Sequence, residues 1–244
     1  MLTLLLLYGV YPCRNFTQTP VSMFNTEEAS VSFCFFESNR AGAALIDKPY
    51  RLSAGAVAIN IDTELSLLGP NYTFSGCHFI NNSATSNYRL VDGASRLSHN
   101  APLNGRGGGI GVVTVTSSQL HFTVRHCFFR SNAALLFGGA IYVWAPHNVT
   151  SEDVTLIHNH FTQNRAQFGG ALHISLAHAL IMDKSFINES GNSTVGTDAM
   201  KIQNCQFVDN KAEFGGGGIG ILPGIVCVCL CVCERERDRE RENM

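Results

Sequence analysis

The chain has 244 residues, of which 45% are hydrophobic and only 15% charged, with a formal net charge of −2. This length suffices for one or two domains with a hydrophobic core. The near-neutral charge excludes the overall basic character typical of nucleic-acid-binding proteins. Soluble domains carry about 25% charged residues, so the charged fraction is low, and nine of the charges lie within residues 234–242.

The N-terminal segment begins with an apolar run at residues 2–10. The run resembles the core of a signal peptide, but it lacks a basic start and a small-x-small cleavage site. An incomplete copy of the repeat described next explains it equally well. We therefore expect residues 1–28 to be either a signal-like segment or a partial repeat.

A two-part internal repeat dominates residues 29–222. Its first block reads Cys-x-Phe-x-x-Asn-x-Ala, and one copy has Asn159 in place of the Cys. The block contributes three series of residues: Cys34, Cys77, Cys127 and Cys205; Phe36, Phe79, Phe129, Phe161 and Phe207; Asn39, Asn82, Asn132, Asn164 and Asn210. The second block is Gly-Gly followed by an alternating apolar run, at residues 138–143, 169–174 and 217–221, with weaker copies at 108–112 and 54–59.

The spacing within the first block predicts short strands joined by bends. Apolar residues recur five and three positions before the Cys, and again at the Cys and the Phe, so each pair shares one face of a strand. The change of parity between the pairs predicts a bend, and the step from Phe to Asn predicts a corner. We expect the Asn to take the left-handed backbone of that corner, because Asn tolerates this conformation.

One strand-bend-strand unit cannot bury its apolar face alone, so successive units are expected to stack. Parallel stacking about 4.8 Å apart would align Phe on Phe, Cys on Cys and Asn on Asn. The sequence therefore predicts an all-β fold, a parallel β-helix of about five coils. The unequal distances between copies predict variable loops, the largest at residues 85–104.

The FxxN and GGA[ILV] blocks resemble the repeats of the polymorphic outer membrane protein family and of related surface proteins. The resemblance covers roughly residues 29–222, and only residues 138–141 and 169–172 match the second block fully. It implies a right-handed parallel β-helix of the pectin-lyase-like type. The C-terminal barrel of the bacterial family is absent from this sequence, which favours a fragment or a eukaryotic chain.

The Cys series has two readings. In the simpler interpretation, the cysteines are small apolar residues that stack in the interior. Disulfides between adjacent coils are the other, because about 4.8 Å lies within the usual Cα separation. Cys127 and Cys205 flank the coil that carries Asn159, so this pair is too far apart to bond.

The histidines suggest a metal site, since His126 and His158 share one repeat position while His78 and His160 share another. No Cys or acidic residue recurs at a ligand spacing, however. We therefore predict a surface with exposed imidazoles, no metal-binding or cofactor-binding residue, and no cofactor.

A carbohydrate-active enzyme, similar to a pectate lyase, is the alternative function, because such enzymes use β-helices. They need clustered carboxylates, whereas the aspartates here are scattered and out of register. They are Asp47, Asp62, Asp92, Asp153, Asp183, Asp198 and Asp209. The sequence predicts no catalytic residue.

Six N-glycosylation sequons point to a secreted or surface-exposed chain. They begin at Asn15, Asn71, Asn81, Asn148, Asn188 and Asn192. Asn81 directly precedes Asn82 of the repeat, which predicts a site too confined for a glycan.

The C-terminal segment, residues 223–244, alternates Val with Cys and then Glu with Arg. Both patterns are those of translated dinucleotide repeats, and we expect the segment to lie outside the fold. A membrane anchor over residues 215–233 is the other interpretation, but glycines, Pro223 and the strand-like Val/Cys alternation argue against it.

Taken together, the sequence predicts an extracellular or cell-surface module, structural or adhesive. Its expected partners are surface proteins or glycans and the rest of a longer β-helix, and not nucleic acid.

Overall fold

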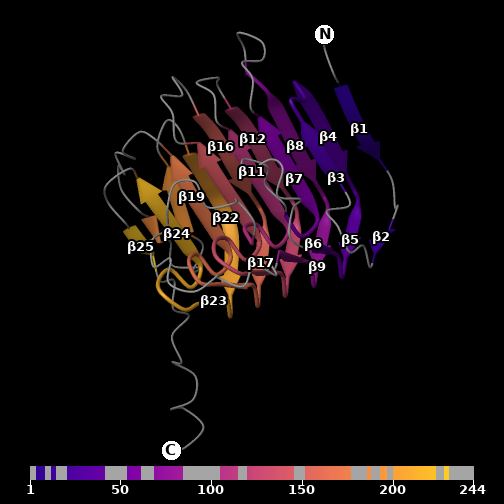
Figure 1. Ribbon diagram of the computed structural model, residues 1–244. Coiled ribbons are helices and arrows are strands. Elements are labelled where there is room, and N and C mark those ends of the chain that lie inside the picture. Colours follow the sequence, from indigo (N-terminus) through magenta and orange to yellow (C-terminus); the bar gives the residue numbers. More distant parts are fainter. Residues whose placement is uncertain are drawn as a thin grey trace, which may run out of the picture.

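The computed structural model describes residues 4–8, 12–14, 21–41, 54–61, 69–84, 105–114, 120–145, 152–176, 186–187, 193–196, 200–223 and 228–230. Every regular element in these ranges is a β-strand, which confirms the all-β class (Figure 1). The strands form three sheets, and nearly all of their pairings are parallel.

The largest sheet has 13 strands in two arms that meet at the long strand β22. The first arm contains β1 (Leu4–Tyr8), β4 (Glu28–Ser32), β8 (Asn71–Ser75), β12 (Leu120–Arg125), β16 (Glu152–Ile157) and β22 (Met200–Val208). The second arm continues through β17 (His160–Thr162), β13 (Phe128–Arg130), β9 (His78–Ile80), β5 (Phe35–Glu37) and β2 (Pro12–Arg14). Two antiparallel strands, β20 (Phe186–Ile187) and β21 (Ser193–Gly196), attach beside β22.

The second sheet has five two-residue strands: β6 (Arg40–Ala41), β10 (Ser83–Ala84), β14 (Ala133–Ala134), β18 (Arg165–Ala166) and β23 (Lys211–Ala212). The third sheet has seven strands: β3 (Val21–Phe24), β7 (Val57–Ile61), β11 (Ile110–Thr114), β15 (Ile141–Ala145), β19 (Leu172–Leu176), β24 (Ile219–Pro223) and β25 (Val228–Leu230). Only β25 pairs antiparallel within it.

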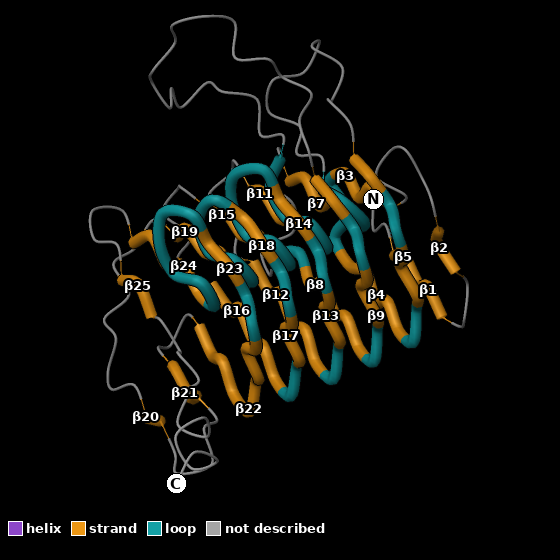
Figure 2. Tube along the Cα trace, turned by 90° about the horizontal axis from the view of Figure 1, so that it is seen from below, coloured by secondary structure: helices purple, strands orange, loops and turns teal. Residues whose placement is uncertain are grey.

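The chain visits the sheets repeatedly in one order: first arm, second arm, five-stranded sheet, seven-stranded sheet. Five stretches follow this path, and we number them segment 1 (28–61), segment 2 (71–114), segment 3 (120–145), segment 4 (152–176) and segment 5 (200–223). Equivalent strands of consecutive segments pair without a shift of register; Phe129 pairs with Phe79 and with Phe161, for example. Figure 2 shows the equivalent strands side by side.

Left-handed residues make the first two of the bends that join the strands of each segment. The first bend lies one residue before the Cys or Asn that opens the block, at Phe33, Gly76, His126, His158 and Asn204, with φ between 51° and 62°. The second lies one residue before the Asn of the block, at Ser38, Asn81, Ser131, Gln163 and Asp209, with φ between 52° and 56°. The prediction that the Asn itself takes the left-handed conformation is therefore wrong. The Asn side chain points inward and is buried in four of the five copies, so the sharp turn falls on its outward-facing neighbour.

Gly139 and Gly108, which are equivalent in the register of β15 and β11, lie where strands of successive segments approach closely. A Cβ atom on Gly139 would overlap the carbonyl oxygen of Gly170 and lie 2.6 Å from the backbone nitrogen of Arg165. A Cβ on Gly108 would overlap the carbonyl oxygen of Gly139 in the same way. Glycine is required at these positions because backbone atoms occupy the space of a side chain.

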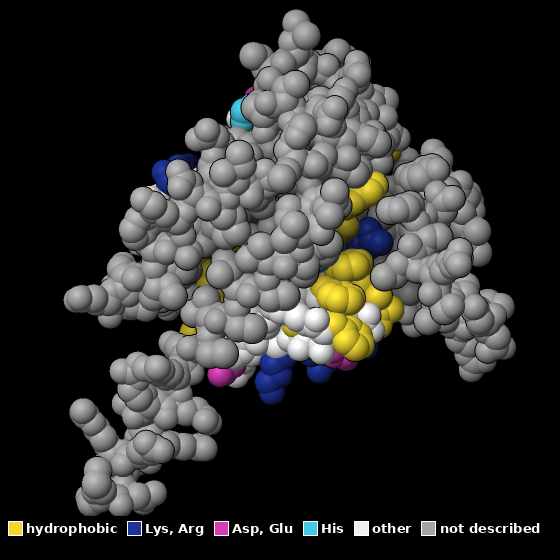
Figure 3. Space-filling view, turned by 90° about the vertical axis from the view of Figure 1, so that its left-hand side faces the viewer, with side chains coloured by type: hydrophobic (Ala, Val, Ile, Leu, Met, Phe, Trp, Pro, Cys, Tyr) yellow, Lys and Arg dark blue, Asp and Glu magenta, His cyan; other side chains and the backbone are white. Residues whose placement is uncertain are grey.

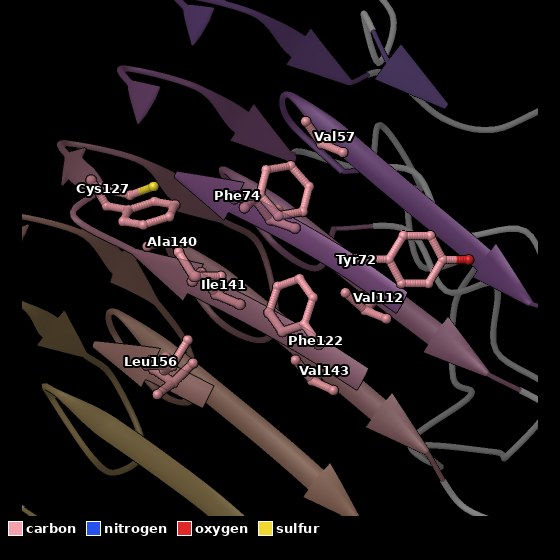
Figure 4. Packing of buried hydrophobic residues seen from close by; sticks show 14 of the residues in the cluster. Val57, Tyr72, Phe74, Val112, Phe122, Cys127, Ala140, Ile141, Val143 and Leu156 are labelled. Carbon is pink, nitrogen blue, oxygen red and sulfur yellow. The ribbon is translucent and has the colours of Figure 1, made fainter. Parts of the chain in front are cut away.

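One hydrophobic cluster joins residues from both arms of the 13-stranded sheet and from the seven-stranded sheet. In Figure 4, Phe74, Phe122 and Leu156 of successive first-arm strands point toward Ile141 and Val143 of β15. All five side chains are fully buried. Burial of large apolar side chains contributes about 1.5–3 kcal/mol each, and this cluster is the main source of stability.

Several sequence predictions concern the ends of the chain. Within residues 1–28, β1 pairs with β4 and β2 with β5, both in parallel. Within residues 223–244, β25 pairs antiparallel with β24, while residues 224–227 and 231–244 lie outside the described ranges. The predicted loop at residues 85–104 also lies outside them. The side of the molecule that carries β24 exposes hydrophobic side chains beside Lys and Arg (Figure 3).

Candidate functional site

The Phe residues of the repeat stack in one column through the interior. Ring centroids of consecutive pairs lie 4.7–4.9 Å apart, and the rings are inclined by only 3–9°. Phe36, Phe79, Phe129 and Phe161 are at most 1% exposed, and Phe207 in segment 5 is 7% exposed. Each ring covers the next, so the column contributes to packing between segments.

The Asn residues of the repeat form a continuous hydrogen-bonded ladder. The backbone N–H and the Nδ2 of Asn82 both donate to Oδ1 of Asn132, each at 3.0 Å. Nδ2 of Asn82 also donates to the carbonyl oxygen of Phe36 at 2.9 Å. The same three bonds recur at Asn132, and Asn164 repeats them toward Asn210. The buried amides are thus satisfied by neighbouring segments, as buried polar groups require.

The Cys series and Asn159 form a second ladder, in which side chains again hydrogen-bond to the backbone of the preceding segment. Nδ2 of Asn159 donates to the carbonyl oxygen of Val124 at 2.8 Å, and its Oδ1 accepts from the backbone N–H of Cys127 at 2.8 Å. Two cysteines make the equivalent contacts through sulfur: the Cys77 thiol donates to the carbonyl oxygen of Val31 at 3.4 Å, and the Sγ of Cys127 accepts from the Cys77 N–H at 3.3 Å. A thiol and an amide are therefore interchangeable here because each combines a donor with an acceptor.

The four ladder cysteines, Cys34, Cys77, Cys127 and Cys205, are buried free thiols. Disulfides between adjacent segments, which the sequence left open, do not occur among them. Burial raises the pKa of Cys127 well above its usual value and that of Cys205 to about 11. The raised pKa keeps the thiols of Cys127 and Cys205 neutral at physiological pH, so these two are poor nucleophiles and poor metal ligands. The pKa of Cys77 is instead lowered, chiefly by its hydrogen bond with Cys127.

The histidines of the repeat lie on the outer surface in two columns. His126 and His158 are exposed and stack with centroids 5.1 Å apart and rings inclined by 11°. The other column alternates Phe35, His78, Phe128 and His160, with centroid separations of 4.5, 5.8 and 6.1 Å. The described residues contain no group of three or more His, Cys, Asp or Glu side chains that could hold a metal ion.

A separate polar cluster surrounds Arg106, which no repeat pattern predicted. Its guanidinium carbon lies 5.2 Å from the ring centroid of Phe137 and 5.3 Å from that of Tyr142, and its Nη1 donates to the Tyr142 hydroxyl at 2.9 Å. The Phe137 ring also contacts the His173 ring, with centroids 4.6 Å apart. Arg106 continues the row Arg106, Phe137 and Phe168, which are linked by isolated parallel bridges. In the sequence, Arg106 directly precedes Gly107, which is in register with Gly138.

Burial controls the protonation of this cluster. His173 is 3% exposed, and burial together with the Arg106 charge lowers its pKa to about 3. Burial raises the pKa of Tyr142 to about 12, although the Arg106 charge and hydrogen bond oppose the shift. Nε of Arg106 and Nδ1 of His173 have no hydrogen-bond partner in the part of the chain that the structure describes. Arg106 and His173 contact the Phe137 ring from the preceding and the following segment, so they do not converge on a shared site.

Two predicted glycosylation sites fall on described side chains. Asn71 and Asn81 are both exposed. The expectation that Asn81 is confined is therefore wrong, because the left-handed bend at this residue turns its side chain outward. Asn15, Asn148, Asn188 and Asn192 lie outside the described ranges. Among the aspartates of the enzyme alternative, only Asp209 has a described side chain, and it is exposed.

In the described part of the chain, no helix has the length and apolar character needed to cross a membrane. Of residues 215–233, the range of the alternative membrane-anchor interpretation, the structure describes 215–223 and 228–230, which include strands β24 and β25. Comparison with family models, with curated proteins and with solved structures gives no match for this chain.

Proposed function

We propose that this chain is a non-catalytic scaffold, a right-handed parallel β-helix of the polymorphic outer membrane protein type. In this proposal each numbered segment is one coil, and the module is extracellular or attached to a cell surface. It presents its outer faces and loops to protein or glycan partners. A longer chain would extend the same coil at one or both ends.

The Asn ladder is the observation that carries the proposal. The Asn that recurs in every copy of the repeat uses its side-chain amide for hydrogen bonds between neighbouring segments, as at Asn82 and Asn132. Recurrent Phe and Cys side chains are likewise buried against their counterparts. The repeat therefore specifies stacking rather than chemistry, and residues free to contact partners are those that vary between copies.

The exposed sequon residues Asn71 and Asn81 support an extracellular location. N-glycans are added only in the secretory pathway, and glycans on these positions would leave the buried faces of β8 and β9 undisturbed. Secretion from a eukaryotic host, followed by enzymatic deglycosylation, tests this point: the native chain should lose more mass than N71Q/N81Q.

Adhesion and turnover assays on the secreted chain test the function. Beads coated with it should bind cell-surface or matrix material, and the soluble chain should release no reducing ends or unsaturated sugars from polysaccharides. Steady release of such products would contradict the proposal and favour the carbohydrate-active alternative. Beads that bind nothing would also contradict it.

A further inference from the structure

The side chains described in the middle of the chain are positively charged, and the acidic pair Glu152 and Asp153 lies at the start of β16, opposite Leu120 and His121. Residues 69–84, 105–114, 120–145 and 154–175 contain four arginines and no Asp or Glu, although the whole chain has a net charge of −2. The described acidic side chains lie instead in segments 1 and 5 or just before segment 1, such as Glu37 and Asp209. This asymmetry creates a local positive potential that the overall composition conceals.

Three of these arginines are exposed, and two of them, Arg125 and Arg130, lie near the bend between the two arms together with three histidines. Arg125, His126, Arg130, His158 and His160 are all exposed, and we call this set the basic ridge. The set occupies adjacent strands: Phe128, between His126 and Arg130, pairs with His160, and Arg130 pairs with Thr162. The ridge therefore spans segments 3 and 4 around the bend between the two arms of the large sheet.

Ring stacking determines what the ridge presents to solvent. His126 and His158 face one another at 5.1 Å, and Phe128 neighbours His160 at 6.1 Å. When the face of a ring lies against its neighbour, the edge is left for solvent. Ring edges carry partial positive charge, and imidazole edges carry N–H donors. Both features favour anions.

A divalent metal on the His126–His158 pair is the competing interpretation. Two imidazoles at this separation could approach Cu²⁺ or Zn²⁺ after small rotations. Arg125 directly precedes His126, however, and pairs with Ile157, whereas the acidic residues of β16, Glu152 and Asp153, pair with Leu120 and His121 at the opposite end of the two strands. A second cation would be repelled, whereas an anion would be attracted by every charged member of the ridge.

We propose that the basic ridge binds an extended anionic polysaccharide through its sulfate or carboxylate groups. This deepens the proposed adhesive function and rests on it. Arg125 and Arg130 would each take one anionic group in bidentate fashion, and the imidazole edges would donate to groups between them. An acidic peptide fits less well, because β12, β13, β16 and β17 are paired on both sides and offer no free strand edge to a peptide backbone.

Titration of the full chain with four polymers tests the proposal. The probes are heparin (sulfated), polygalacturonate (carboxylated), dextran (neutral) and poly-glutamate (an acidic peptide). The variants are R125Q/R130Q and H126Q/H158Q, with K201Q/K211Q as the matched control. The control removes the same two charges from exposed positions in segment 5, where Asp209 and Glu213 lie.

We expect heparin or polygalacturonate to bind, dextran not to bind, and affinity to fall as salt rises to about 0.15 M. R125Q/R130Q should weaken binding at least about 10-fold, since both guanidinium contacts are lost, and K201Q/K211Q less than about 3-fold. H126Q/H158Q should give an intermediate loss. Circular dichroism of each variant verifies that the fold is retained.

Three results would overturn the inference: binding of dextran equal to that of heparin, preferential binding of poly-glutamate, or equal losses in the ridge and control variants. The bead assay, run with the same proteins, distinguishes failure of the proposed adhesive function from failure of the basic-ridge proposal. Beads that adhere equally well with R125Q/R130Q would leave the adhesive function standing and exclude the ridge. Beads that adhere to nothing would remove both.

Discussion

The backbone N–H of Cys127 donates to Oδ1 of Asn159 at 2.8 Å, although every other ladder position in this series holds a cysteine. Asn159 also donates to the carbonyl oxygen of Val124, as Cys77 does to that of Val31. One amide thus replaces one thiol without breaking the ladder. The series is defined by hydrogen bonding across segments, and apolar size alone does not explain it.

Replacing Asn159 tests this equivalence. Asn159→Leu leaves the Cys127 N–H and the Val124 carbonyl buried without partners, which costs about 2–4 kcal/mol of unfolding free energy. Asn159→Cys should cost less than about 1.5 kcal/mol, because a thiol supplies both roles at neighbouring positions. Denaturant unfolding measures both. Equal losses in the two variants would contradict the hydrogen-bonding account.

Gly139→Ala tests the close approach of the backbones. The added methyl group would overlap the Gly170 carbonyl, so we expect a loss of at least about 3 kcal/mol or failure to fold. Gly218→Ala is the matched control, since its Cβ would meet only Phe207 side-chain atoms at 3.5–3.8 Å. The control should change the midpoint of thermal unfolding only slightly. A tolerated Gly139→Ala would show that these strands can move apart.

The left-handed bend at Gln163 predicts a stabilising substitution. Its φ is 56°, a conformation that costs a typical residue about 1–2 kcal/mol and that Asn accepts more readily. Gln163→Asn should therefore raise the unfolding free energy by about 0.5 kcal/mol. Thr162→Asn places the same residue in strand β17 and should lower it instead. The opposite order in chemical denaturation would argue against a left-handed bend at residue 163.

His173 predicts a loss of stability in acid. Its pKa is about 3 in the folded chain and about 6.5 when unfolded, so below pH 6.5 the unfolded state binds a proton that the folded state does not. His173 therefore leaves the unfolding free energy unchanged well above pH 6.5 and lowers it by about 2 kcal/mol at pH 5. His173→Gln should flatten this part of the pH profile of unfolding, measured from pH 7.5 to pH 5. An unchanged slope would show that other groups cause the acid sensitivity.

The repeat made some features predictable and left others hidden. The positions of Phe79, Phe129 and Asn132 follow from a fixed spacing, because identical side chains at equal spacing can pack only against each other. Parity changes indicated the bends but not which residue takes the positive φ, since residues as different as Ser131 and Gln163 do so. The all-β class and parallel sheets are confirmed, whereas the coil closure and its handedness remain proposals.

The features missed entirely lie outside the repeat. Arg106 occupies a place where later segments have Phe137 and Phe168, and a single departure from a pattern carries no periodic signal. The positive charge of the described side chains in segments 2–4 was also hidden, because acidic residues elsewhere balance it in the total, chiefly Glu152 and Asp153 and those of residues 62–70 and 177–199. Contacts between segments had to be known before either could be recognised.

The one-way order of the Asn ladder gives the molecule an electrical direction. The ladder Asn of each of segments 1–4 donates from Nδ2 to the Oδ1 of the ladder Asn in the following segment, from Asn39 through to Asn210. Dipoles aligned in this manner add, and hydrogen bonds in a chain polarise one another. The axis through the five segments therefore has a negative and a positive pole, as an α-helix does. A segment joined to one end meets a different field from a segment joined to the other, so growth of the stack is intrinsically directional.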